Sequence, residues 1–213
     1  MGKETVSGRD VVIHFDGQRC IHARNCVLGH PDVFVPNVDG EWIHPDAVSA
    51  EEVALTARQC PSGAIQYERL DGQRGEPAPV VNTVCLRENG PLALNAPLTV
   101  AGEAIGYRAT LCRCGLSKRK PYCDNSHAEG GFIASGETAP KESQPLAARD
   151  GALAIEPQKD GPLKIVGNLE IVTGTGHTVD RCSQTWLCRC GQSGNKPYCD
   201  GSHRKAGFAA EGA

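Results

Sequence analysis

Aromatic residues are scarce in this chain of 213 residues, where Phe, Trp and Tyr together make up 5% of the composition. Glycine and proline are frequent instead, with 25 and 14 copies. Because aromatic side chains bury the most apolar surface per residue, this composition argues against one large core and favours several small, loop-rich modules. Domains below about 70 to 80 residues usually need a staple such as a disulfide or a metal.

The sequence also lacks long apolar runs and a strong excess of charge of one sign. No stretch approaches the roughly 20 apolar residues that span a bilayer, and residues 1–10 are charged and polar rather than an apolar signal segment. The formal net charge of -3 gives no indication of nucleic-acid binding. We therefore expect a cytoplasmic protein that binds neither membrane nor nucleic acid.

Cysteine, by contrast, is plentiful, with 11 copies. In a reducing cytoplasm, metal ligation is a better explanation of these thiols than disulfides. Six of them, with two histidines, fall into two copies of one pattern, which reads CRCGLSKRKPYCDNSH at 112–127 and CRCGQSGNKPYCDGSH at 188–203.

The spacing within each copy predicts two pairs of metal ligands. Cysteines two residues apart in an extended segment point to the same side. The proline before the third cysteine and the aspartate after it favour a short helix that brings this cysteine and the histidine together. The expected pairs are Cys112 with Cys114, Cys123 with His127, Cys188 with Cys190, and Cys199 with His203.

This repeated pattern resembles the CDGSH iron-sulfur proteins of the mitoNEET type. The resemblance implies a 2Fe-2S cluster in each copy, with the Cys-x-Cys pair on one iron and the later Cys and His on the other. The first copy departs from the motif at Asn125, and we expect binding to survive because Asn tolerates a left-handed backbone. Considered alone, a Cys3His ligand set also suits structural zinc.

The repeat extends beyond the ligand loops. Residues 89–94 echo residues 160–165, and strands are expected at 98–100 and 169–172. Each repeat is therefore a small β module, the first at 85–135 and the second at 151–213. MitoNEET-like homodimers pack two identical modules around a two-fold axis, so the resemblance implies an intrachain pseudo-dimer within a monomer.

Residues 1–70 form a different module. Short strands are expected at 11–15, 33–35, 41–43 and 65–67. Ser49 with Glu52 three residues later predicts a capping box, which opens a helix that runs to about residue 59. The predicted fold class of the whole chain is α+β, built from small β-rich modules.

The N-terminal module holds three thiols, Cys20, Cys26 and Cys60. Two neighbouring cysteines and a distant one before a proline resemble single-cluster bacterial ferredoxins, including divergent three-cysteine members. Where four-cysteine relatives have a further thiol this chain has Ala23, so the resemblance implies a 3Fe-4S cluster on three thiolates. The alternatives are a 4Fe-4S cluster completed by His22 or a small ligand, and a shell without a cluster.

These observations predict an electron-transfer protein that acts with redox partner proteins. A cluster donor to apo iron-sulfur acceptors, or a redox or pH sensor, is the alternative. We expect no enzymatic activity, because the sequence contains no nucleophile-base pair and no flavin or nucleotide signature.

A few further residues complete the sequence-based predictions. Cys85 and Cys182 occupy different places in the two repeats, so we expect structural thiols there. Four basic residues recur in both copies, namely Arg113, Arg189, Lys120 and Lys196. Their expected role is to donate hydrogen bonds around the clusters or to contact a partner, and the alternative is that they are solvated surface charges.

Overall fold

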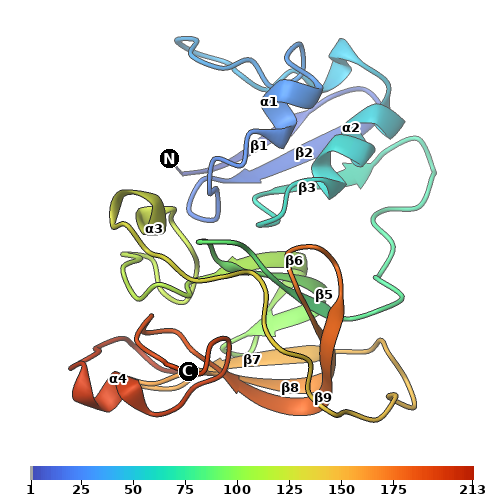
Figure 1. Ribbon diagram of the computed structural model, residues 1–213. Helices are drawn as coiled ribbons and strands as arrows, with labels where there is room; N and C mark the ends of the chain where they lie inside the picture. The colour runs from blue at the N-terminus through green and yellow to red at the C-terminus, as the bar shows by residue number, and fades with distance from the viewer. Residues whose placement is uncertain (1) are drawn as a thin grey trace. The chain divides into compact units, whose positions relative to one another are not determined.

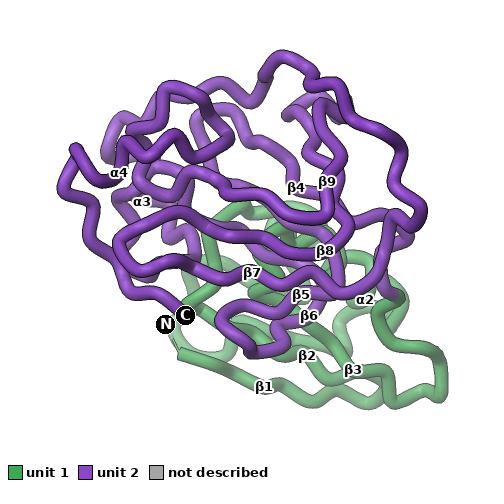
Figure 2. The backbone as a smooth tube through the Cα atoms, turned by 90° about the horizontal axis from the view of Figure 1, so that it is seen from below, with its two compact units in different colours: residues 1–77 green, residues 78–213 purple. Residues whose placement is uncertain are grey.

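The computed structural model of the chain describes residues 2–213 (Figure 1). The chain divides into two compact units, Met1–Pro77 and Ala78–Ala213 (Figure 2). Both predicted CDGSH modules lie within the second unit. Among the described residues, no helix is long and apolar enough to cross a membrane.

The first unit is a small antiparallel sheet packed with helix α2. Its strands, in sheet order, are β1 (Lys3–Ser7), β2 (Val11–Asp16) and β3 (Ile65–Arg69). Its helical segments are α1 (Asn25–Gly29), the 3-10 turn η1 (Pro45–Ala47) and α2 (Ala50–Arg58). Strand β2 alternates buried and half-buried residues, as a strand with one face on the core must.

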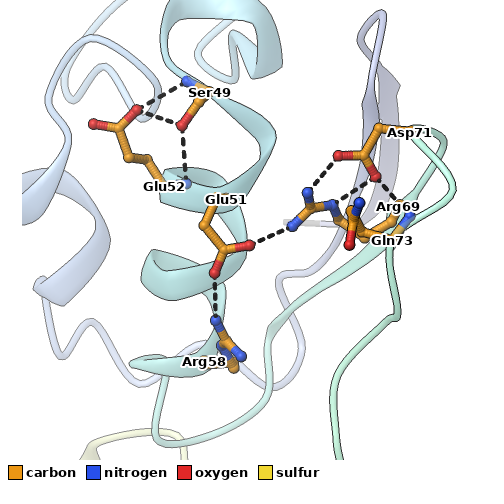
Figure 3. A network of polar contacts seen from close by, with 7 residues as sticks. All are labelled: Ser49, Glu51, Glu52, Arg58, Arg69, Asp71 and Gln73. Atoms are coloured by element: carbon orange, nitrogen blue, oxygen red, sulfur yellow. Dashed lines mark hydrogen bonds and ion pairs between the residues drawn. The ribbon is translucent and has the colours of Figure 1, made fainter.

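Helix α2 begins at the predicted capping box, so the helix expected from Ser49 is confirmed. The Ser49 hydroxyl accepts a hydrogen bond from the Glu52 backbone N–H at 3.3 Å, and the Glu52 carboxylate accepts one from the Ser49 backbone N–H at 3.0 Å (Figure 3). Glu51 then binds Arg69 of β3 at 2.6 Å. This ion pair connects the first turn of the helix to the sheet.

The strands predicted at 33–35 and 41–43 are wrong. The two segments meet only in an isolated antiparallel bridge between Phe34 and Ile43. Asn37 and Gly40 between them have positive φ angles of 59° and 106°, which interrupts an extended ladder. The apolar residues are explained by burial instead, because Phe34 and Ile43 both lie in the core of the unit.

The second unit contains a six-stranded sheet and two single-turn helices. The strands are β4 (Thr83–Leu86), β5 (Leu92–Val100), β6 (Glu103–Leu111), β7 (Leu153–Pro157), β8 (Leu163–Val172) and β9 (Thr178–Leu187). The helices are α3 (Ser126–Glu129) and α4 (Ser202–Lys205), one in each ligand loop (Figure 1). The strands predicted at 98–100 and 169–172 are confirmed within β5 and β8.

Strands of the two repeats pair with one another in this sheet. Within each repeat the long strands form an antiparallel hairpin, β5 with β6 and β8 with β9. Between the repeats, β5 runs parallel to β7 and β4 runs parallel to β8. Each repeat's first strand therefore pairs with the long strand of the other, and both repeats contribute to one hydrophobic core.

Candidate metal centres

The Cys-x-Cys pairs follow directly after the strands β6 and β9. The Sγ atoms are 3.8 Å apart for Cys112 and Cys114, and 3.7 Å apart for Cys188 and Cys190. Two sulfur ligands about 2.3 Å from a tetrahedral metal lie about 3.8 Å from each other. All four side chains are buried, so each pair has the spacing and the dry surroundings of two ligands on one metal atom.

The second pair in each loop joins a cysteine to a histidine. The distance from Sγ to Nδ1 is 3.4 Å both for Cys123 with His127 and for Cys199 with His203. A sulfur and a nitrogen ligand on one tetrahedral metal lie about 3.6 Å apart. The structure thus brings all eight predicted CDGSH ligands into pairs of suitable geometry.

The aspartate after the third cysteine, which the sequence suggests as the capping residue of the short helix, does not take the capping position. The residue that caps α4 is Gly201 in a left-handed conformation with φ of 85°, not Asp200. Asp200 lies one residue earlier and accepts a hydrogen bond from the Ser202 backbone N–H at 2.9 Å. Asn125 takes the equivalent place in the first loop with φ of 72°, so the expected tolerance of Asn there is confirmed.

Backbone N–H groups point at the ligand sulfurs. Four such contacts of 3.4 Å are made by Leu116 to Cys114, Asn125 to Cys123, Gln192 to Cys190 and Gly201 to Cys199. Hydrogen bonds of this kind favour the thiolate and stabilise a negatively charged metal centre. Burial acts in the opposite direction and raises the pKa of Cys123 and Cys190 to about 11. A bound metal is therefore needed to hold these thiols as thiolates at neutral pH.

The three thiols of the first unit come from three different segments. Cys20 follows β2, Cys26 lies in α1, and Cys60 follows α2, each half-buried against the core. Burial raises the pKa of Cys26, and the charges of Cys60 and Cys20 act in the same direction. His22 is exposed, and its backbone N–H donates to the Cys20 sulfur at 3.4 Å.

Ligands that close on a single ion are absent from the part of the chain that the structure describes. Within residues 2–213, no group of three or more His, Cys, Asp or Glu side chains converges tightly enough to hold one metal ion. The close contacts in the CDGSH-like loops are instead pairs.

Comparison with protein families agrees with this geometry. The family model described as "Iron-binding zinc finger CDGSH type" matches residues 89–128 and 160–204. The model described as "Divergent 4Fe-4S mono-cluster" matches residues 6–70. The chain therefore has a divergent 4Fe-4S mono-cluster domain, followed along the sequence by two CDGSH segments. No curated protein matches the chain. Iron-sulfur binding is thus supported for both units.

A buried arginine in each CDGSH segment forms hydrogen bonds with the backbone around its ligand loop. Arg113 and Arg189, which stand between the paired cysteines, are only 2% and 1% exposed, so the alternative of solvated surface charges is wrong for them. The guanidinium groups donate to backbone carbonyls, those of Arg87 and Ser135 for the first and of Gly161, Glu211 and Gln158 for the second. Each arginine therefore ties its ligand loop to the beginning and the end of its own repeat.

Each of these arginines interacts electrostatically with a cysteine of the other repeat. Burial lowers the pKa of Arg113, while the thiolate of Cys188 in the other repeat acts to raise it. Arg189 stands in the same relation to Cys112. The recurrence of these arginines in both copies could be read from the sequence, but their burial could not.

The two CDGSH loops touch through their backbones. A Cβ atom at Gly115 would lie 2.9 Å from the carbonyl carbon of Cys190, and one at Gly191 would lie 2.8 Å from that of Cys114. Both glycines have left-handed φ angles, of 83° and 80°. Only glycine satisfies this conformation and this close approach together. The sequence could not identify the contact, because it depends on how the repeats pack.

The CDGSH loops share two further sets of contacts. The hydroxyls of Ser117 and Ser193 each donate to a tyrosine carbonyl five residues on at 2.6 Å. Lys120 and Lys196 each donate through Nζ to the carbonyl of that serine, at 2.5 and 2.6 Å. These bonds hold the loop closed between its two ligand pairs. The remaining thiols, Cys85 and Cys182, lie outside the loops on β4 and β9.

Proposed function

We propose that the chain is an electron carrier that holds a 2Fe-2S cluster in each CDGSH segment. The ligands of the first cluster are Cys112, Cys114, Cys123 and His127, and those of the second are Cys188, Cys190, Cys199 and His203. The observation that carries the proposal is the pairing of these side chains at 3.4–3.8 Å. Structural zinc instead requires four ligands around one ion.

The chain's own residues support a charged redox group at these sites. A 2Fe-2S cluster supplies one-electron chemistry when it is bound. Buried thiols exclude water from the first pair, backbone N–H groups donate to the sulfurs, and a buried arginine lies behind each loop. Such fixed dipoles and charges stabilise either charge state without large rearrangement, as an electron carrier requires.

We further propose that the two segments form an intrachain pseudo-dimer. Three reciprocal relations support it. Each repeat's first strand pairs with the long strand of the other repeat. Each loop glycine lies against the backbone of a cysteine in the other loop. Each buried arginine interacts electrostatically with the first cysteine of the other loop. Reciprocal contacts of this kind are those of a two-fold interface.

For residues 1–70 we propose a ferredoxin-like domain with a 3Fe-4S cluster on Cys20, Cys26 and Cys60. The three half-buried thiols, which all pack against the same hydrophobic core, support it. The description of the matching family as a 4Fe-4S domain favours a second candidate, a 4Fe-4S cluster with a fourth ligand from outside the three thiols. Paramagnetic spectra of the oxidised protein distinguish the two.

Repeated redox cycling tests the proposed role. Protein purified without oxygen is reduced and reoxidised many times, and iron and sulfide are counted after each cycle. An electron carrier keeps both contents constant and is reduced reversibly. Loss of iron to an apo iron-sulfur acceptor added to the same sample would instead indicate a cluster donor.

A further inference from the structure

A hollow of about 670 Å³ opens beside the second CDGSH segment. The side chains that matter for its chemistry are Trp186, Lys159, Asp160 and Arg204, with the ligands Cys199 and His203 at one edge. Small-molecule sites have volumes of about 300–1,000 Å³ and combine apolar surface with a few polar groups. The hollow meets both conditions.

Trp186 provides the aromatic surface. It lies on β9 between the buried residues Thr185 and Leu187, so its side chain points away from the core, with 43% of the residue exposed. Among residues 2–213 its indole N–H has no hydrogen-bond partner, unlike that of Trp42, which donates to Glu4 at 3.0 Å. Its ring is therefore available for stacking and its N–H for donation.

The charged side chains around the hollow are two cations and one carboxylate, Lys159, Arg204 and Asp160. Lys159 and Arg204 are exposed, and neither side chain forms an ion pair or hydrogen bond within the described part of the chain. The Asp160 carboxylate accepts a hydrogen bond from the Ala210 backbone N–H at 2.9 Å and adds one negative charge, so the three side chains together remain net positive. Two cations with a shared opening favour an anionic group near the ring.

The first CDGSH segment lacks all three features. In the register of the repeat, Thr110 replaces Trp186, Glu88 replaces Lys159 and Ala128 replaces Arg204. Thr110 is buried, and the Glu88 carboxylate accepts a hydrogen bond from the Gly136 backbone N–H at 2.5 Å. The combination of an exposed indole ring and two exposed cations is thus specific to the second segment and is not a consequence of the ligand motif.

We propose that this hollow binds a small planar aromatic anion, with its ring stacked on Trp186 and its anionic group between Lys159 and Arg204. Carboxylate, sulfonate and phosphate satisfy the same two cations. The site goes beyond the proposed electron transfer, because binding depends on the ring and the charges rather than on a change of redox state. It also makes the two CDGSH segments unequal, since only one has a ligand beside its histidine.

Calorimetric titration of the cluster-loaded full chain with 2-naphthoate tests the proposal. We expect one saturable site per chain. Trp186→Thr and Lys159→Glu each install the residue of the first segment, and each should weaken binding about tenfold or more, as expected for loss of one stacking or charged contact. Ile133→Thr, which removes an 85% exposed apolar side chain near the first segment, should leave the affinity unchanged.

Two further measurements separate the possible results. Neutral 2-naphthamide should bind about tenfold more weakly than 2-naphthoate, because it loses the charge interaction. Absence of saturable binding, equal binding of the amide, or wild-type affinity in both Trp186→Thr and Lys159→Glu would overturn the proposal. Visible absorption of the same samples reports cluster content, so a failure of cluster binding is seen independently of the titration.

Discussion

Arg189 illustrates, at the scale of a single residue, how a charged side chain can hold a metal-binding loop in place. Its guanidinium donates to three backbone carbonyls at 2.6–3.1 Å and lies over the Phe208 ring at 5.4 Å. A planar group with five fixed donors can satisfy three carbonyls at once, whereas a lysine ammonium at the end of a flexible chain cannot reach them all.

Replacing this residue by lysine should therefore destabilise the second unit. We expect Arg189→Lys to lower the free energy of unfolding by about 2–4 kcal/mol, because buried carbonyls lose their donors while a buried charge remains. Chemical denaturation followed by circular dichroism measures the change. Arg204→Lys, an exposed substitution fifteen residues later, is the control, and similar stability of the two variants would show that the buried contacts matter little.

At the scale of the secondary-structure elements, the contact between the two ligand loops can be tested through glycine. Gly191 and Gly176 have similar left-handed φ angles, of 80° and 92°, but only Gly191 has another backbone against it. Alanine at either position costs about 1–2 kcal/mol in conformational strain. Gly191→Ala must in addition push the two CDGSH loops apart.

We accordingly expect Gly191→Ala to disturb the spectra of both CDGSH centres and to unfold at a lower temperature than Gly176→Ala. The two variants are compared by visible absorption and thermal denaturation. If both lose the same stability, and both keep wild-type spectra, the loops do not depend on this contact.

The linker between the repeats is held to β8 by Glu170. This carboxylate is 2% exposed and accepts a hydrogen bond from Arg149 at 2.6 Å, which lowers the pKa of Glu170. A group with a lowered pKa in the folded state stabilises the protein above its unfolded pKa, about 4.3 for Glu, and this contribution is lost as the pH falls through the folded value.

Glu170→Gln should therefore be less stable than the wild type at pH 7, and this difference should shrink below about pH 4.3 as the wild-type carboxylate is protonated. Unfolding temperatures measured from pH 7 to pH 3 test this sign. Glu142→Gln, an exposed change in the same linker, is the control. A stability difference for Glu170→Gln that stays constant with pH would contradict the account.

The sequence predicted individual helices, strands and ligand pairs better than it predicted which strands pair with one another. The capping box at Ser49 fixed the start of α2, and the repeated ligand pattern identified the pairs in both loops, because these features depend on neighbouring residues. The parallel pairing of β4 with β8 was not predictable, because a short apolar run does not specify which strand it joins. The burial of Arg113 and the hollow at Trp186 depend on the same long-range packing.

At the scale of the whole molecule, the two units should respond independently to loss of a ligand. Cys60 belongs to the first unit, and none of the CDGSH ligands does. We expect Cys60→Ser to remove one spectral component and to destabilise residues 11–68, while the CDGSH signals persist. Electron paramagnetic resonance and limited proteolysis measure the two effects, and an unaltered spectrum would show that the first unit holds no cluster through Cys60.

We propose that each CDGSH segment holds two irons rather than one zinc. The most direct measurement is the iron, acid-labile sulfide and zinc content of the full chain purified without oxygen, together with paramagnetic spectra after reduction. Two 2Fe-2S clusters and one 3Fe-4S cluster predict about seven irons and about eight sulfides per chain, with two distinct reduced 2Fe-2S signals and no zinc. About two zinc ions per chain, with no 2Fe-2S signal, would contradict the account.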